Sequence, residues 1–220
     1  MSNCRPANGN QPWPLSCALD GFGALLFDLD GTLVDTMPLH CLAYAQVFAA
    51  RGYTFTMNDY LDHVGPPAAI TIPAFAAAVG MPPIDDAEAR TIHQEKKQRF
   101  RALLETKPVP TLPASGLLDR YHGQIPMAIV SSGNRNGVEA ILRNLGWLDL
   151  FGGVITGDDV EQGKPHPEPF LLGAEALGVA PERCVVLEDT QSGIAGARAA
   201  GMSVIDVTVP GALIAAGDGQ

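Results

Sequence analysis

Five short apolar runs, separated by longer stretches of helical periodicity, constrain the fold of this 220-residue chain more than any other feature. Alternation of apolar strands with helices predicts an α/β fold, in which a parallel sheet carries helices on both faces. The runs span residues 24–28, 126–131, 152–156, 183–188 and 203–207. Polar side chains that directly follow such strands meet at the carboxyl edge of the sheet, where folds of this class place their binding sites.

The strand signal is interrupted between Thr36 and about Thr111, where helical periodicity replaces it. Helices are predicted over residues 39–51, 68–79 and 85–105, although Pro73 weakens the second of these predictions. The interruption indicates a helical domain inserted into a discontinuous core. We expect a loose N-terminal extension over residues 1–20, a core over 21–36 and 111–220, and the helical insertion over 37–110.

The charge and cysteine content exclude several classes of partner. The formal net charge of −10 argues against nucleic acid and against an anionic membrane surface, because both attract basic surfaces. No apolar run has the length of a membrane span or the form of a signal peptide. The cysteines lack metal-site spacing, which suits a reduced, cytoplasmic protein; they are Cys4, Cys17, Cys41 and Cys184. We expect a monomer or a weak homodimer.

Two carboxylates, Asp28 and Asp30, follow the first apolar run and precede Gly31. Alternate residues of a strand face the same way, so both can point toward one site as the strand ends. Carboxylates that close repel each other, and a divalent cation is the natural way to hold both of them ionised beside an anionic substrate. We therefore expect Mg²⁺. The plainer alternative is a pair of solvated aspartates before a glycine turn.

Three further polar segments follow later apolar runs. Ser131, Ser132, Gly133 and Asn134 precede a predicted helix, and backbone N–H groups there can hold a phosphate. Lys164 lies between Gly163 and Pro165, and Pro165 favours an extended backbone at the lysine. Glu188 and Asp189 end the fourth run and are the remaining candidate metal ligands. Alone, these segments equally suit a helix cap, a surface lysine and a capping pair of acids.

Taken together and in this order, the four motifs resemble those of the haloacid dehalogenase superfamily with a helical cap. The resemblance covers residues 22–208 and favours the branch of sugar-phosphate phosphatases and β-phosphoglucomutase. Residues 121–207 are especially similar to bacterial fructose-1-phosphatase-like enzymes. The resemblance implies a three-layer Rossmann-like core with an inserted helical cap domain.

The resemblance also implies roles for the core residues. Asp28 would be the nucleophile and Asp30 the general acid and base. Ser131 would bind phosphate, with Ser132, Gly133 and Asn134 beside it, and Lys164 would anchor negative charge. Magnesium would be held by Asp28, the Asp30 carbonyl and Asp189, with Glu188 acting through bound water or the outer shell.

In the cap, the resemblance places His40 at the entry, the loop of residues 63–67 over the substrate, and Lys96 at a distal substrate group. His40 and His63 are equally suited to be hydrogen-bonded surface residues. Lys96 belongs to a basic stretch, residues 90–107, which a solvated helix face also explains. Mutase relatives carry an arginine shortly after the loop glycine, whereas this chain has prolines and alanines at 66–69.

We therefore expect a magnesium-dependent phosphatase that hydrolyses a small phosphorylated metabolite, a sugar or sugar-acid phosphate, through an aspartyl-phosphate. A β-phosphoglucomutase-like phosphotransferase is the nearest alternative. A 2-haloacid dehalogenase ranks lower, because dehalogenation needs neither a metal nor the proton donor Asp30. A binding module without activity would be expected to lack one of the four charged motif residues, and all are present: Asp28, Asp30, Lys164 and Asp189.

Overall fold

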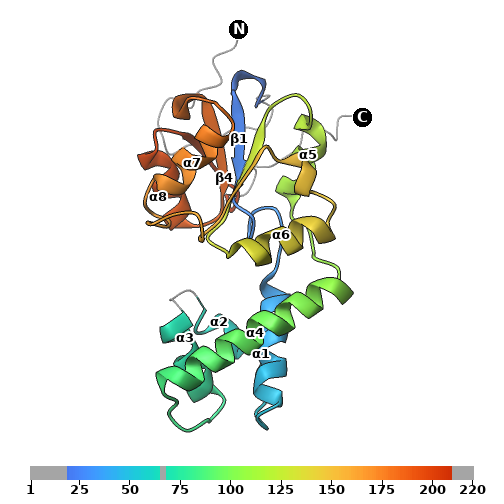
Figure 1. Ribbon diagram of the computed structural model, residues 1–220, viewed down its shortest axis with the longest axis vertical. Coiled ribbons are helices and arrows are strands. Elements are labelled where there is room, and N and C mark those ends of the chain that lie inside the picture. The colour runs from blue at the N-terminus through green and yellow to red at the C-terminus, as the bar shows by residue number, and fades with distance from the viewer. Residues whose placement is uncertain (1–18, 65–67, 210–220) are drawn as a thin grey trace. The chain divides into compact units, whose positions relative to one another are not determined.

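The computed structural model describes residues 19–64 and 68–209, and its core contains one parallel sheet (Figure 1). Each predicted apolar run contains one strand, and the five strands have the order β3-β2-β1-β4-β5. The strands are β1 (Ala24–Phe27), β2 (Met127–Val130), β3 (Gly153–Ile155), β4 (Cys184–Glu188) and β5 (Ser203–Asp206). The predicted α/β fold class is confirmed.

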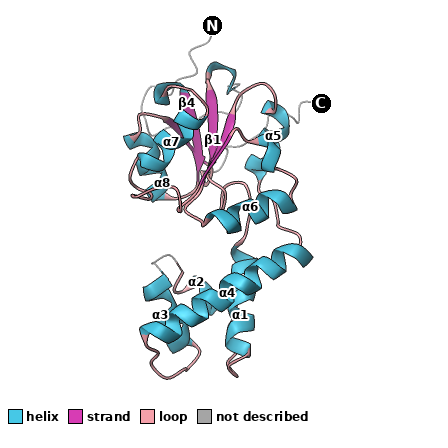
Figure 2. Ribbon diagram, viewed as in Figure 1, coloured by secondary structure: helices cyan, strands magenta, loops and turns pink. Residues whose placement is uncertain are grey.

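Helices cover both faces of the sheet (Figure 2). The helices of the core are α5 (Gly116–Tyr121), α6 (Arg135–Asn144), α7 (Glu168–Ala176) and α8 (Gln191–Ala199). The chain moves outward from β1 through β2 to β3, then crosses back to β4 and β5. Right-handed crossovers therefore place α5 and α6 on one face and α7 and α8 on the other. Short 3₁₀ turns complete the core at Leu19–Gly21, Pro113–Ser115, Leu148–Leu150 and Pro181–Arg183.

The central strands are buried on both sides, which explains why they are continuous apolar runs rather than alternating ones. Phe170 of α7 is fully buried in the same cluster as Leu26 and Val130. Gly173 lets α7 approach closely, since a Cβ there would lie 2.9 Å from the Leu26 side chain. The sheet is thus a rigid base for the loops at its carboxyl edge.

The strand register brings the polar motifs together. Phe27 at the end of β1 lies opposite Leu187 of β4 and Ile129 of β2. Asp28, Glu188 and the loop after β2 therefore leave the sheet at the same level. Connections from β1 and β4 diverge to opposite sides, and such a switch point in a parallel sheet opens a crevice for ligands.

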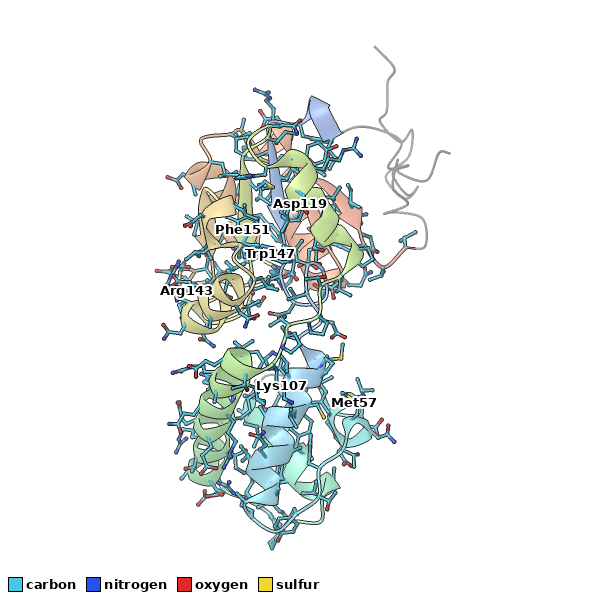
Figure 3. All side chains as sticks on the ribbon, turned by 90° about the vertical axis from the view of Figure 1, so that its right-hand side faces the viewer. Met57, Lys107, Asp119, Arg143, Trp147 and Phe151 are labelled. Atoms are coloured by element: carbon cyan, nitrogen blue, oxygen red, sulfur yellow. The ribbon has the colours of Figure 1, made fainter. Side chains whose placement is uncertain are left out.

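Residues Thr36–Val109 form a second compact unit, in which helices are the regular elements of the described residues. Its helices are α1 (Met37–Ala49), α2 (Met57–Leu61), α3 (Ala68–Ala78) and α4 (Asp86–Thr106). Tyr44, Phe48, Phe55 and Phe75 form an aromatic core between them. Many side chains of α4 extend on the side turned away from α1 (Figure 3).

Two features of this helical unit differ from the sequence-based prediction. Helix α3 continues through Pro73, where a break was the expected risk. Helix α2 was not predicted; at five residues it is too short for a periodic signal, and a capping box of Thr56 and Asp59 starts it.

The described core begins at Leu19, which is buried and whose N–H donates to the Tyr121 hydroxyl at 3.0 Å.

Several predictions fall on residues outside the described ranges. They concern residues 1–18 of the extension with Cys4 and Cys17, the loop residues 65–67, and residues 210–220. Cys41 and Cys184 are both buried and unbridged. Within the described ranges, every helix is either too short or too polar to cross a bilayer.

Candidate active site

The centre of the site is a buried ion cluster at the carboxyl edge of β1 and β4. The Lys164 ammonium donates to Asp28 Oδ1 and to Glu188 Oε1, each at 2.6 Å. The side chains of Lys164, Asp28 and Glu188 are 5%, 9% and 0% exposed. Removing one member of such a cluster leaves uncompensated buried charge, so the three groups depend on one another.

Burial shapes the ionisation of this cluster. It raises the pKa of Asp28, an effect that Lys164 opposes and Glu188 reinforces. Burial lowers the pKa of Lys164, but the charges of Asp28 and Glu188 outweigh it and raise the pKa overall. The lysine is therefore held as a fixed cation, while Asp28 needs further positive charge to be fully ionised.

Asp28 has an acceptor to spare. Its Oδ2 is buried, and no hydrogen-bond partner reaches it from the described residues. Asp189 lies nearby across Gly31, where the backbone has φ of +94° and an added Cβ would overlap the Asp189 carboxylate. The Thr32 hydroxyl donates to Asp189 Oδ1 at 3.2 Å, and burial together with Glu188 raises the pKa of Asp189. Both carboxylates would be stabilised by a cation.

These donors suit magnesium better than a metal held by protein side chains alone. Among the described residues, no three His, Cys, Asp or Glu side chains converge as a metal cage. Magnesium keeps several waters and takes only one or two carboxylates. Asp28, Asp189 and the carbonyl of Asp30 fit that requirement. Glu188 is less suited to be a direct ligand, because its Oε1 accepts from Lys164 and its Oε2 from the N–H and hydroxyl of Thr190.

The loop after β2 forms a second part of the site. Ser131 is buried, and its Oγ accepts from the N–H of Gly133 at 3.0 Å. Ser132 is exposed. Asn134 caps α6, with its side chain accepting from the Gly137 N–H at 3.0 Å, so that oxygen is occupied. The predicted phosphate loop therefore presents mainly Ser131, Ser132 and backbone N–H groups.

The loop after β3 supports the phosphate loop, a role that the sequence did not predict. Gly157 donates to the carbonyl of Gly133 at 2.8 Å. The N–H of Arg135 donates to Asp158 at 2.9 Å, and its guanidinium donates to Asp159 at 2.7 Å. The adjacent acids were visible in the sequence, but their partner lies more than 20 positions away.

A cavity of about 260 Å³ opens between these two loops. Its lining includes Ser131, Ser132, Gly157, Glu161 and Lys164. A predicted phosphate-binding serine, Ser131, and the predicted charge anchor, Lys164, thus line the same open cavity of the core.

The predicted cap residues lie in the helical unit. Lys96 Nζ is 2.8 Å from His40 Nδ1, and the His40 ring stacks on Phe100 with centroids 4.1 Å apart. Burial and the charge of Lys96 lower the pKa of His40 to about 3, so His40 is neutral and its Nδ1 accepts from the lysine. His63 does not join this group; its Nδ1 contacts the carbonyl of Asp59 at 3.1 Å.

Comparison with known proteins gives a consistent result. A family model described as haloacid dehalogenase-like hydrolase matches residues 22–201. The chain is 34% identical over 186 residues to the fructose-1-phosphate phosphatase YqaB of Escherichia coli K12, covering 84% of this chain and 96% of that protein. It is 36% identical over 190 residues to hexitol phosphatase A of the same organism, covering 84% and 82%.

Two solved structures share the fold at similar identity. CbbY from Rhodobacter sphaeroides, in complex with phosphate, aligns with a TM-score of 0.70 at 30% identity and covers 83% of this chain and 84% of its own. A putative β-phosphoglucomutase from Thermotoga maritima aligns with a TM-score of 0.68 at 31% identity, covering 82% and 83%.

Proposed function

Because the chain belongs to the haloacid dehalogenase-like hydrolase family and is a phosphoric monoester hydrolase within it, we propose that it is a magnesium-dependent phosphatase acting on a small sugar or sugar-acid phosphate through an aspartyl-phosphate. The observation that carries the proposal is the buried cluster at Lys164. One oxygen of Asp28 contacts this lysine, and the other is a buried acceptor without a protein partner among the described residues.

The first step is phosphoryl transfer to Asp28. A carboxylate oxygen of Asp28 forms a bond to phosphorus as the bond to the sugar oxygen breaks, and Asp30 gives its proton to that leaving oxygen. Ser131, the backbone N–H groups of its loop and Lys164 stabilise the negative charge on the phosphoryl oxygens. Asp28, Asp189 and the Asp30 carbonyl would hold magnesium, which when bound would supply the remaining positive charge.

The second step is hydrolysis of the aspartyl-phosphate. Asp30, now ionised, takes a proton from a water molecule as the water oxygen attacks phosphorus, and the bond to the Asp28 oxygen breaks. Inorganic phosphate leaves, and Asp30 is again protonated for the next cycle. Both steps use Asp30 in opposite directions, which requires the residue to gain and lose a proton near neutral pH.

A direct test measures phosphate release from a panel of sugar phosphates, polyol phosphates and phosphoglycolate, with magnesium and with a chelator. We expect turnover with magnesium only. Asp28→Asn keeps the shape of the side chain but removes the nucleophilic charge, and we expect it to abolish turnover. Undiminished hydrolysis in chelator, or by Asp28→Asn, would overturn the mechanism.

A mutase is the second candidate, because one of the structural relatives is named as a putative β-phosphoglucomutase. A mutase must hold a second phosphate at the far end of its substrate, and arginine is the side chain best suited to grip it. Ala68 and Ala69 begin α3 where such an arginine would be expected. We propose instead that Lys96, which His40 already orients, is the cap cation that binds the hydroxyl groups at the far end of the substrate.

The distinction is measured with β-glucose 1-phosphate and a trace of the bisphosphate. We expect inorganic phosphate to accumulate, and efficient formation of glucose 6-phosphate with little phosphate release would favour the mutase. In the same assay Lys96→Ala is expected to act mainly on KM, because it removes a contact with the substrate and no reacting group.

A further inference from the structure

The cavity at the carboxyl edge of the core contains an acidic residue that the proposed chemistry does not use. Glu161 lines it together with Ser131, Ser132 and Lys164. If Ser131 and Lys164 bind the phosphoryl group, the atoms next to that group enter the same space, where they meet Glu161. At a water's share of about 30 Å³, a cavity of 260 Å³ equals roughly nine waters. That volume suits a phosphoryl group and the first few carbons attached to it.

The backbone at Glu161 is held in place. The N–H groups of Glu161 and Gln162 donate to the two carboxylate oxygens of Glu168, at 2.9 and 3.1 Å. Glu168 is the first residue of α7, and Pro169 beside it also lines the cavity. The helix therefore fixes the point at the cavity wall from which the exposed Glu161 side chain extends.

The charge balance of the cavity is negative. Among its lining residues Lys164 is the base and Glu161 the acid. The lysine is already matched by two buried carboxylates, those of Asp28 and Glu188. The proposed metal compensates the phosphoryl group, but these lining residues offer no further positive charge to a second anionic group on the substrate.

We propose that Glu161 is a specificity-determining residue that selects phosphate monoesters with an uncharged sugar or polyol as leaving group. Hydroxyl groups of such a leaving group can donate to its carboxylate. A carboxylate or a second phosphate at the same place is repelled. The inference rests on the proposed function, and it narrows the substrate from sugar or sugar-acid phosphates to neutral sugar and polyol monophosphates.

The test compares kcat/KM for fructose 1-phosphate, 2-phosphoglycolate and fructose 1,6-bisphosphate at saturating magnesium. The proteins are the wild type, Glu161→Gln, Glu161→Lys and the control Glu175→Gln. Glu175 is an exposed acid of α7 and does not line the cavity, so its variant changes the net charge equally.

Exposed charge pairs are weak, so the expected effects are modest. Relative to fructose 1-phosphate, we expect the two anionic substrates to gain about 3-fold in Glu161→Gln and about 10-fold in Glu161→Lys. The control should leave the ratio unchanged. Higher salt should reduce the discrimination of the wild type, because it screens exposed charges.

The outcomes separate the inference from the function on which it rests. If the wild type hydrolyses fructose 1-phosphate but no Glu161 variant changes the ratio, the specificity role is wrong and the phosphatase assignment stands. An equal change in Glu175→Gln would also overturn it, since net charge would then suffice. If the wild type hydrolyses none of the three, the proposed function itself fails. Thermal unfolding of each variant checks that it is folded.

Discussion

Replacing Lys164 by methionine tests whether the buried ion cluster holds the site together. Methionine keeps most of the aliphatic stem, so the change removes the charge with little loss of packing. It leaves Asp28 and Glu188 in a site where their side chains are 9% and 0% exposed. Breaking a buried ion pair by removing one partner costs about 3–5 kcal/mol, and we expect a loss of that size at pH 7.

The matched control is Arg143→Met, which breaks an ion pair on the surface of α6. Arg143, labelled in Figure 3, is 60% exposed and pairs with Glu139 one helical turn away. Exposed pairs of this kind contribute about 0.2–1 kcal/mol. The two variants remove one positive charge each from the same unit, so the difference between them isolates burial.

Urea unfolding followed by circular dichroism, with chelator present, measures both free energies of unfolding. In an Asp28→Asn background, Lys164→Met should cost about 1–2 kcal/mol less than it does in the wild type, because only Glu188 then loses its partner. A loss below about 1 kcal/mol, equal to that of Arg143→Met, would refute this account of the cluster.

Three further predictions concern other parts of the chain. Asp30→Asn should lower kcat about 10²–10⁴-fold, because the variant lacks the proposed general acid and base. Magnesium binding should survive, since only the backbone carbonyl of residue 30 is proposed to reach the metal. Kinetics measures the first effect and isothermal titration the second, and an unchanged kcat on an alkyl phosphate would contradict the acid–base role of Asp30. Because the fold lowers the pKa of His40 to about 3, the unfolded chain binds a proton below pH 6.5 that the folded chain does not bind. Between pH 7 and pH 5 the free energy of unfolding should therefore fall by about 1–2 kcal/mol more in the wild type than in His40→Phe. Equal losses in the two proteins would contradict this. Gly193→Ala should cost about 1–3 kcal/mol in urea unfolding, because the new Cβ would overlap the Glu188 carboxylate, and a neutral result would show that α8 can move away.

The sheet was predictable because its central strands are buried on both faces, so each strand is a short, continuous apolar run. A helix of the same length would expose one side and would not be apolar throughout. The end of each run then predicted where the polar motifs gather. Asp28 follows β1 and Glu188 ends β4, which is a neighbour of β1, and the structure brings both into contact with Lys164.

Other parts of the structure depend on contacts that a local pattern does not contain. The hydrogen bond between Arg135 and Asp159 joins the start of α6 to the loop after β3. Arginine in a helix and aspartate in a turn are both common, so neither residue indicates its partner. His40 and Lys96 are 56 positions apart, so their contact follows from the packing of α1 on α4. The side-chain oxygen of Asn134 caps α6, a role that the sequence did not distinguish from anion binding, because both use the same residue types at the same position. Substrate binding by Asn134 stays a prediction.

The most direct test of the central claim is to trap the aspartyl-phosphate. The enzyme is mixed with magnesium and a sugar phosphate that it hydrolyses, and the mixture is quenched in acid within one turnover. Borohydride is then added, because it reduces an aspartyl-phosphate to homoserine. Peptide mass spectrometry should find homoserine at position 28 alone, and neither in chelator nor in Asp28→Asn. Rapid phosphate release without modification at position 28, or with modification at Asp30 instead, would contradict the assignment of Asp28 as the nucleophile.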